Sequence, residues 1–326
     1  MQDRQWSGGA GLNSLCWHNN EGKMQKTKIA AALLATLTVT PGLAAETLDA
    51  TPRIAVMSAF APEWIALQDA LSERKDYKVN GTTFATGLIE GKPVVLFLTG
   101  VSMVNAAMTS QLALDVFNVE SIVFSGIAGG VNPERHIGDV IVPAQWGQYL
   151  DVILARETSE GEFTPPPFLE APFPNFGMIF PQEVSIAREG AEPENRFWFA
   201  VDPDLLAVAE KVAAEINLED CVEANACLTT APGIYVGGNG VSGAAFVDNA
   251  AFREYAFGTF EAQVLDMESA AVAHVAYAND VPFIAFRSLS DLAGGGEGEN
   301  EMGTFMGLAS ANSAAVVTAF IAALPN

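Results

Sequence analysis

The sequence predicts a single domain with an α/β fold. Apolar runs of strand length alternate with stretches of helical spacing, and residues 264–291 contain a complete strand, helix and strand. Such alternation is typical of βαβ units. Half of the chain, 50%, is hydrophobic, and residues 46–326 suffice for one large domain with a sizeable core.

The first half of this domain alternates strands and helices in order. Pro62 is placed to open a helix whose Trp64, Leu67 and Leu71 recur at helical spacing. The later apolar runs each lead into glycine, at Gly100 and in the turn at 125–130. The predicted elements are a strand at 53–58, the helix after Pro62, a strand at 93–98, a helix at 103–117, a strand at 121–124, and a turn followed by a strand at 137–143.

An irregular stretch interrupts this alternation at residues 157–194. Its proline-rich part, 163–174, leaves few backbone donors for strand pairing. Its phenylalanines favour a packed flap or a subunit contact over a disordered linker. Asp202 and Pro203 then predict the start of an amphipathic helix, and the segment 231–249 is rich in glycine and small residues.

The strand–helix–strand unit at 264–291 carries two acidic residues at its strand ends, Glu268 and Asp291. Ser269 is predicted to cap the helix, which ends before Pro282. In an open α/β sheet such a unit places the carboxyl ends of both strands on one rim, where ligands bind. We therefore expect both carboxylates to face one pocket, with the glycine-rich loop 294–300 placed to gate it.

The first 45 residues are predicted to be an upstream extension plus a secretory signal peptide at about 24–45. A basic start at 24–28 precedes an apolar run at 29–39, and 41–45 resembles a cleavage site. The run is shorter than the about 20 residues that span a membrane. We expect residues 46–326 to form a mature domain that is periplasmic or secreted, with no membrane attachment.

The predicted mature domain is strongly acidic. The chain has 16 Lys/Arg and 39 Asp/Glu; residues 1–45 hold four and two of them, which leaves 12 against 37, a formal charge of −25. Nucleic acids and anionic membranes bind proteins through Lys and Arg that neutralise phosphate. The charge therefore argues against both partners and favours a small neutral or cationic substrate.

Two cysteines fall in the predicted mature domain, Cys221 and Cys227. In an oxidising compartment they can pair as a disulfide, and two free thiols in a loop are the alternative. No cysteine spacing typical of a metal site occurs, and His136 and His274 are the only histidines of this domain. We expect no metal and no other cofactor.

The order of motifs from Arg53 to Ala323 resembles the nucleoside phosphorylase and nucleosidase superfamily, most closely its 5′-methylthioadenosine/S-adenosylhomocysteine nucleosidase branch. The resemblance is carried by Ser-Gly-Ile-Ala-Gly-Gly at 125–130, Gly-Asp-Val at 138–140, Asp-Met-Glu at 266–268 and Arg-Ser-Leu-Ser-Asp at 287–291. The glycine turn lacks the G-x-G-x-x-G of a dinucleotide site. The resemblance implies a three-layer α/β/α catalytic domain with a central mixed, partly closed β-sheet, and a homodimer whose partner helps to close each pocket.

The resemblance also implies hydrolysis of the N-glycosidic bond of a purine nucleoside of the methylthioadenosine, S-adenosylhomocysteine or adenosine type. Cleavage builds positive charge on the ribose and negative charge on the departing purine. The family's general acid maps onto Asp291, which must hold a proton near neutral pH. Glu268 maps onto the carboxylate that grips ribose hydroxyls and faces the developing cation. Glu63 maps onto the base that activates water.

Further positions are assigned to substrate binding by the same resemblance. Phe246 maps onto the aromatic side chain that stacks on the purine, Val247 onto a residue whose backbone bonds the purine edge, and Met267 onto a residue that packs on the sugar. Arg287 resembles an arginine near the water site, where Thr99 replaces another hydroxyl residue. The remaining assigned positions lie in the glycine-containing turns: Gly100, Ala128 and Gly129.

Three classes of function remain open at this point. Phosphorylases of the superfamily surround phosphate with arginines, one of them at the end of the strand before the glycine turn, where this chain reads Val-Phe-Ser at 123–125. Phosphate would be poorly held there, which favours hydrolysis. One alternative is a phosphorylase whose phosphate is held by Arg287 and the glycine turns. The other is a non-catalytic nucleoside-binding or storage protein. The presence of all three carboxylates, Glu63, Glu268 and Asp291, argues against this alternative.

Overall fold

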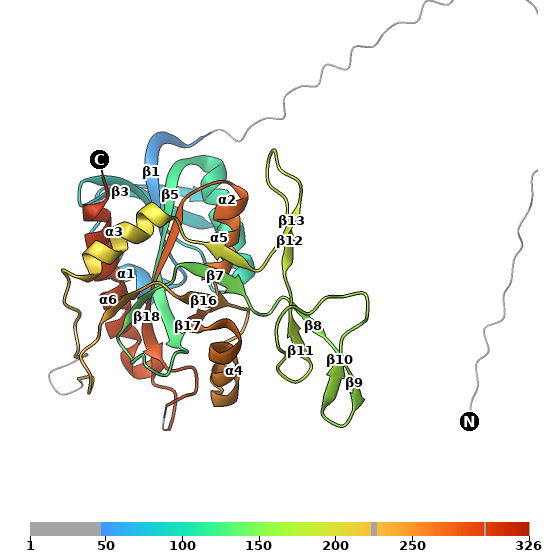
Figure 1. Cartoon of the computed structure of the whole chain (residues 1–326). Coiled ribbons are helices and arrows are strands. Elements are labelled where there is room, and N and C mark those ends of the chain that lie inside the picture. The colour runs from blue at the N-terminus through green and yellow to red at the C-terminus, as the bar shows by residue number, and fades with distance from the viewer. Residues whose placement is uncertain (1–46, 223–226, 297, 326) are drawn as a thin grey trace, which may run out of the picture. The chain divides into compact units, whose positions relative to one another are not determined.

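A computed structural model of the chain describes residues 47–222, 227–296 and 298–325 (Figure 1). The predicted upstream extension and signal peptide at 1–45 lie outside the described residues. Their presence, and the domain boundary after residue 45, remain predictions.

A twelve-stranded mixed sheet forms the centre of the described domain. Its strands are β1 Asp49–Ser58, β2 Ser72–Val79, β3 Thr82–Ile89, β4 Lys92–Leu98, β5 Phe117–Gly130, β6 Val140–Val142, β7 Gln145–Gln148, β14 Trp198–Ala200, β15 Ile234–Val236, β16 Asn239–Ser242, β17 Ala262–Asp266 and β18 Phe283–Asp291. The main path is β14-β7-β16-β17-β5-β1-β4-β3-β2; β18 pairs with β5, β6 pairs with β18, and β15 pairs with β6. The predicted strands at 53–58, 93–98 and 121–124 all lie in this sheet.

Strand β5 is the centre of the sheet because it pairs with three strands. It runs parallel to β1 and β18 and antiparallel to β17. Gly129, near its end, is the register partner of both Leu265 in β17 and Asp291 in β18. The strand–helix–strand unit at 264–291 is therefore not a simple parallel pair. Its two strands nevertheless end together, because β17 reaches the end of β5 from the opposite direction.

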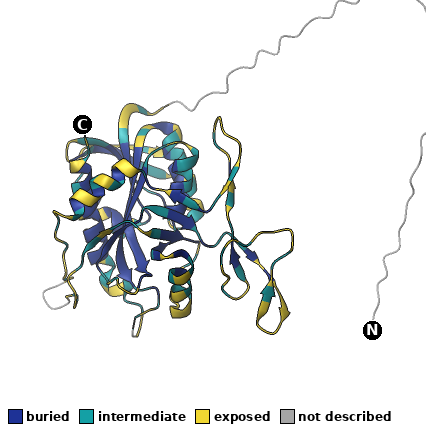
Figure 2. Cartoon of the chain, viewed as in Figure 1, coloured by how far each residue is buried: buried dark blue, intermediate teal, exposed yellow. Residues whose placement is uncertain are grey.

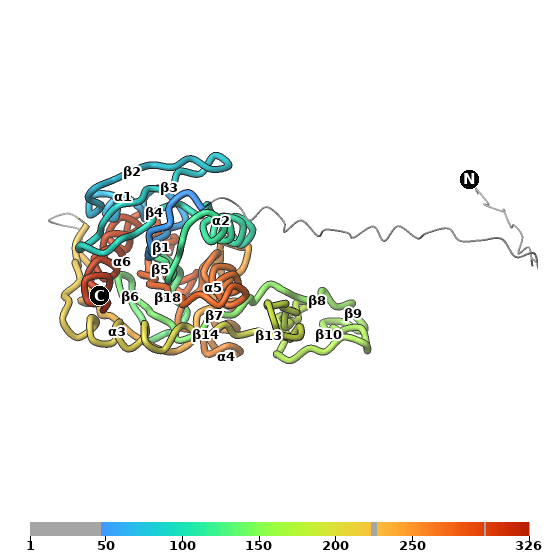
Figure 3. Tube along the Cα trace, turned by 90° about the horizontal axis from the view of Figure 1, so that it is seen from above, coloured from blue at the N-terminus to red at the C-terminus, as the bar shows by residue number. Residues whose placement is uncertain are grey.

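Helices cover both faces of the sheet, which confirms the predicted α/β fold class with helices on either side. The helices are α1 Ala61–Asp69, α2 Met103–Val116, α3 Pro203–Ala213, α4 Ala250–Phe260, α5 Ser269–Ala278 and α6 Met302–Ala323. Helix α6 packs on β18 and β5 and contacts α1 and α3, whereas α5 packs on α2 and on β16 and β7. Figures 1 and 3 show the sheet between these two groups.

The helix boundaries follow local sequence signals, with one difference at α5. Asp202 caps α3 as predicted, accepting hydrogen bonds from the backbone N–H groups of Asp204 and Leu205. Ser269 is not the cap of α5: Glu268 occupies that position, and the Ser269 hydroxyl donates instead to Asp266. The prediction was wrong because a buried carboxylate competes for the serine hydroxyl.

Among the described residues, helix α6 has the length and the apolar composition that a membrane-spanning helix would need. In this fold 56% of its apolar window is buried inside the domain, where Val317 and Phe320 belong to the core. Burial against the sheet accounts for this composition.

The proline-rich stretch forms small hairpins that project from the body of the domain (Figures 1 and 2). Its strands pair as β8 Val152–Leu154 with β11 Ile179–Pro181, β9 Arg156–Ser159 with β10 Glu162–Thr164, and β12 Val184–Ile186 with β13 Glu194–Arg196. Phe173 packs on Phe260 of α4, and Phe176 packs on Tyr255, whose hydroxyl donates to the carbonyl of Pro174 at 2.7 Å. One part of this excursion is thus packed on the domain, while Phe168 is 81% exposed.

Candidate active site

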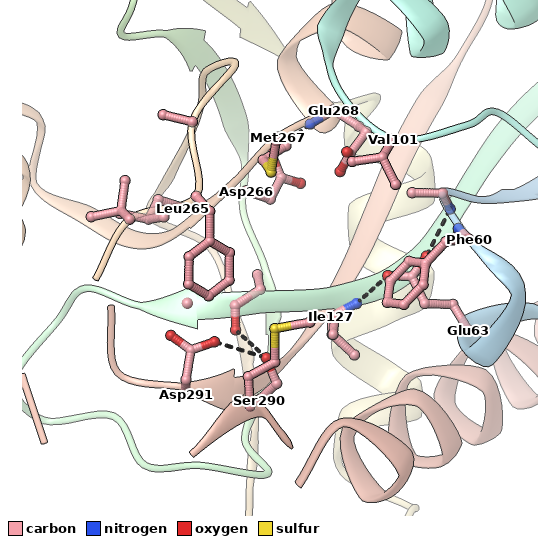
Figure 4. A pocket seen from close by; sticks show the side chains of 17 residues that line it. Phe60, Glu63, Val101, Ile127, Leu265, Asp266, Met267, Glu268, Ser290 and Asp291 are labelled. Atoms are coloured by element: carbon pink, nitrogen blue, oxygen red, sulfur yellow. Dashed lines mark hydrogen bonds between the residues drawn. The ribbon is translucent and has the colours of Figure 1, made fainter. Parts of the chain in front are cut away.

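A cavity of about 220 Å³ lies where β5, β17 and β18 end (Figure 4). The three predicted catalytic carboxylates approach it from different sides: Glu63 from α1, Glu268 from the junction of β17 and α5, and Asp291 from the end of β18. The other predicted residues that line it are Met267, Phe246, Val247, Ala128 and Gly129. The remaining lining residues are Ala59, Phe60, Val101, Ile127, Ala245, Leu265, Asp266, Ser290 and Met302.

Three residues assigned to substrate binding, Thr99, Gly100 and Arg287, do not line this cavity. The Thr99 hydroxyl is buried and donates to the carbonyl of Gly100 at 2.9 Å. Gly100 has a positive φ of 80°, and its turn brings Val101 to the cavity wall. Arg287 is completely buried. Thr99 and Gly100 therefore contribute by shaping the turn that carries Val101. Arg287 contributes by supporting residues that line the cavity.

Glu63 is held in the first turn of α1 by backbone donors on both of its oxygens. Oε2 accepts from the N–H groups of Ala59 at 2.7 Å and Phe60 at 3.2 Å, and Oε1 accepts from Ile127 in β5 at 2.8 Å. Burial raises the pKa of Glu63, while Arg287 and these hydrogen bonds act in the opposite direction. The side chain is therefore fixed in orientation and can accept a proton more readily than an exposed glutamate.

Glu268 follows β17 and is held by the turn before α2. Its Oε1 accepts from the backbone N–H of Ser102 at 2.7 Å, and Ser102 adopts a positive φ of 80°. Burial, with the neighbouring charge of Asp266, raises the pKa of Glu268 to about 7, against the opposing effect of Arg287. This carboxyl therefore changes its protonation state near neutral pH.

Asp291 ends β18 and is oriented by hydrogen bonds on both oxygens. Oδ1 accepts from the backbone N–H of Ala293 at 2.8 Å, and Oδ2 accepts from the hydroxyl of Ser290 at 2.9 Å. The side-chain amide of Asn300 lies 3.5 Å from Oδ1. Burial raises the pKa of Asp291 despite these donors. The group therefore stays protonated to a higher pH than an exposed aspartate.

Arg287 lies behind the cavity wall and links the carboxylates. Its Nε is 2.7 Å from Oδ2 of Asp266, while Nη1 is 3.8 Å from Oε1 of Glu63 and Nη2 is 3.7 Å from Oε2 of Glu268. Neither η nitrogen has a hydrogen-bond partner among the described groups. Buried donors of this kind are normally satisfied, so they are available to a hydroxyl or a water molecule between the carboxylates.

Asp266 and the apolar wall are the parts of the site that the sequence interpretation missed. Asp266 was part of the Asp-Met-Glu motif but received no role, although its place at a strand end was the same signal that identified Glu268. Phe60, Val101 and Met302 also line the cavity. Nothing in the sequence distinguished them, because apolar residues of these types are common in any core.

The two cysteines lie away from the carboxylates. Cys221 and Cys227 are joined by a disulfide, and Cys227 borders a separate cavity with His136, Leu292 and Glu301. In the described part of the chain, no group of three or more His, Cys, Asp or Glu side chains is placed to hold a metal ion.

Comparison with known proteins identifies the family of the chain. The family model of the phosphorylase superfamily matches residues 53–322. The 5′-methylthioadenosine/S-adenosylhomocysteine nucleosidase of Mycobacterium tuberculosis is 26% identical over 268 residues, covering 81% of this chain and 94% of the relative.

Two Helicobacter pylori structures share the fold. An inhibitor-bound 5′-methylthioadenosine/S-adenosylhomocysteine nucleosidase has a TM-score of 0.63 at 21% identity, with 84% of this chain and 100% of that chain covered. A futalosine hydrolase has a TM-score of 0.62 at 21% identity, with coverage of 84% and 98%. Because the family model spans most of the sequence, this chain belongs to the phosphorylase superfamily.

Proposed function

We propose that this protein hydrolyses the N-glycosidic bond of a purine nucleoside of the methylthioadenosine, S-adenosylhomocysteine or adenosine type. The observation that carries the proposal is the convergence of Glu63, Glu268 and Asp291 on one largely apolar cavity. Such a cavity offers contact surface for a purine and a sugar, and each carboxylate is buried enough to take part in proton transfer or charge stabilisation. The nucleosidase names of the relatives support the same reaction class.

Asp291 is the proposed general acid. As the bond between the ribose C1′ and the purine N9 breaks, its electron pair moves to the purine, and Asp291 donates its proton to N7. The raised pKa of Asp291 supports this role, because the group stays protonated to a higher pH than an exposed aspartate. Phe246 and Val247 lie at the same cavity and are the proposed contacts of the purine.

Glu268 and Glu63 act on the sugar side in this proposal. Ionised Glu268 binds ribose hydroxyls and stabilises the positive charge that develops on the ring. Glu63 takes a proton from a water molecule as the water oxygen bonds to C1′, which yields ribose and leaves the proton on Glu63. The raised pKa of Glu63 supports proton uptake at this step.

Hydrolysis is favoured over phosphorolysis by the charges at the cavity. None of its lining residues, all of them described, is Lys, Arg or His. Arg287 lies behind the wall, and Glu63 and Glu268 are the carboxylates near its η nitrogens. A phosphate placed there would meet two carboxylates for one guanidinium, which is unfavourable.

Base release from methylthioadenosine, adenosine and inosine, with and without phosphate, tests the proposal. Hydrolysis predicts purine release that does not depend on phosphate. Strict phosphate dependence would identify a phosphorylase, and absence of turnover with retained nucleoside binding would identify a binding or storage protein.

A homodimer is part of the proposal. Val101, in the turn before α2, and Val104 and Met108, in the first half of α2, are 43%, 78% and 62% exposed, and Val101 also lines the cavity. Exposed apolar residues of this kind at the edge of a cavity favour a protein contact there. Met108→Glu is expected to give a monomer in light scattering and to raise KM, whereas Leu154→Glu, an exposed apolar residue of β8, leaves the mass unchanged.

Export to the periplasm or medium is also proposed, on the basis of the signal-peptide pattern at 24–45. Cell fractionation and N-terminal sequencing of the expressed protein test it. A mature N-terminus near residue 46 in the exported fraction is expected, and an uncleaved cytoplasmic protein would contradict it.

A further inference from the structure

Asp266 is surrounded by hydrogen-bond donors although the site chemistry described above gives it no role. Its Oδ2 accepts from the Ser269 hydroxyl at 2.5 Å and lies 2.7 Å from Nε of Arg287. Its Oδ1 accepts from the Ser242 hydroxyl and from the backbone N–H of Glu268 at 3.3 Å. The residue is buried at the end of β17 and borders the cavity. A carboxylate with this many donors is fixed in place.

The contacts of Asp266 fix the guanidinium of Arg287. Nε of Arg287 donates to the Ser269 hydroxyl at 2.9 Å and forms an ion pair with Oδ2 of Asp266 at 2.7 Å, so the two groups hold the same edge of the guanidinium. Its face lies on the ring of Phe124, 4.0 Å from Cζ to the centroid. On another side the backbone of Gly126 leaves no room, since a Cβ built there would be 2.0 Å from Nη1. Of the guanidinium nitrogens, only Nη1 and Nη2 have no hydrogen-bond partner among the described residues.

These η nitrogens stop short of both catalytic carboxylates. Distances of 3.8 Å to Glu63 and 3.7 Å to Glu268 are longer than charge-assisted hydrogen bonds of about 2.7–2.9 Å. A free guanidinium would instead form a two-point pair with one carboxylate, which is its preferred geometry. Such a pair would remove that carboxylate from contact with water or ribose.

We propose that Asp266 is a positioning residue that holds Arg287 between Glu63 and Glu268, so that both carboxylates stay open to substrate and water. This inference rests on the proposed nucleosidase function for its catalytic consequence. The arrangement itself is a property of the protein alone and can be measured without turnover.

Asp266 has a second effect, through its charge. The groups that face Glu268 are Asp266, Arg287, Glu63 and the backbone N–H of Ser102. Asp266 raises the pKa of Glu268, and Arg287 lowers it. Removing the charge of Asp266 ends one repulsion and frees Arg287 to approach, and both changes favour ionised Glu268.

The test compares Asp266→Asn with wild type and with Ser242→Ala. The asparagine removes the charge, and with it the ion pair to Nε of Arg287, at nearly constant volume. The alanine removes one hydrogen bond to Oδ1 but keeps the charge and the contact with Arg287. In profiles of kcat/KM against pH, Asp266→Asn is expected to move the acidic limb down by about one pH unit and to lower kcat, while Ser242→Ala leaves the limb in place.

A readout without catalysis separates this inference from the proposed function. In protein labelled with [δ-13C]glutamate, the Glu268 signal, assigned with Glu268→Gln, should titrate at lower pH in folded Asp266→Asn than in wild type. If wild type turns over no nucleoside, the nucleosidase proposal fails but this titration still tests Asp266. Should Asp266→Asn not fold, Ser269→Ala, which weakens the same Nε anchor, is expected to give a smaller shift in the same direction. An unmoved Glu268 titration in a folded variant overturns the inference.

Discussion

Gly126 and Arg287 approach so closely that a side chain at position 126 cannot be accommodated. A Cβ built on Gly126 would lie 2.0 Å from Nη1 of Arg287 and 2.5 Å from Oε1 of Glu63. The glycine in β5 therefore allows the arginine and the proposed base to lie side by side beneath the cavity. The segment 125–130, predicted as a glycine turn, is the end of strand β5, and the glycine at 126 has a steric reason.

Gly126→Ala is expected to displace Arg287 or Glu63 and to reduce kcat at least 100-fold, because a displacement of about 1 Å at such a site is enough for that loss. Overpacking of the core should also destabilise the fold by about 1–3 kcal/mol. Gly258→Ala is the matched control, since apart from its chain neighbours and the backbone of α4 no atom lies within 4 Å of its added Cβ. Steady-state kinetics and urea unfolding measure both effects, and wild-type kinetics in Gly126→Ala would contradict the steric argument.

Asp291→Asn is expected to lower kcat by about 10²–10⁴-fold, the usual contribution of a general acid. The amide keeps the size of the side chain and can still accept from Ala293 or Ser290, so the thermal unfolding temperature should change little. Asp248→Asn, an exposed aspartate that accepts from Asn300, serves as the control for a lost charge in the same loops. A near-wild-type kcat for Asp291→Asn would exclude this residue as the acid.

Removing the disulfide is expected to reduce stability without reducing activity. Cys221 and Cys227 close a loop of six residues in sequence, for which chain entropy predicts a loss of about 2 kcal/mol on substitution by serine. Neither cysteine lines the carboxylate cavity, so kcat should stay close to wild type. Urea unfolding of the double serine variant measures the loss. Two free thiols in the unreduced, denatured wild-type protein would contradict the bond itself.

The sequence was sufficient to predict the elements whose pattern depends on local physics. Buried strands such as β5 show as apolar runs, and α3 shows an N-cap at Asp202. Helices α4 and α6 were not predicted. Helix α6 is apolar on nearly every side, and a helix buried against both a sheet and other helices has little amphipathic period to detect.

Residues of the candidate site could be predicted where the chemistry requires a carboxylate. Residues whose role depends only on where the fold places them could not be predicted. Carboxylates at strand ends identified Glu268 and Asp291, and the cavity brings them together with Glu63. The burial of Arg287 behind the wall, and its anchoring by Asp266, depend on the antiparallel approach of β17 to β5. Register between segments more than a hundred residues apart has no local signal, so sequence patterns could not supply it.

Glu268→Gln is expected to stabilise the protein at alkaline pH while abolishing most activity. Because the folded pKa of Glu268, about 7, lies above its ordinary value of 4.5, the folded state favours the protonated form. The contribution of this group to stability is fully present below pH 4.5 and is lost as pH rises through 7. A glutamine resembles the protonated acid at every pH, so the variant should be more stable than wild type by about 1–3 kcal/mol at pH 8 and equal to it near pH 4.

Urea unfolding at these two pH values, alongside kcat, measures this trade between stability and function. Glu219→Gln provides the control for a lost glutamate charge, since Glu219 lies outside the cavity. A Glu268→Gln variant no more stable than wild type at pH 8 would show that the site does not hold this carboxylate at a cost. The expected gain means that burial of Glu268 beside Asp266 lowers the stability of the fold at pH 8. In the proposed reaction the same position lets ionised Glu268 stabilise the positive charge that develops on the ribose.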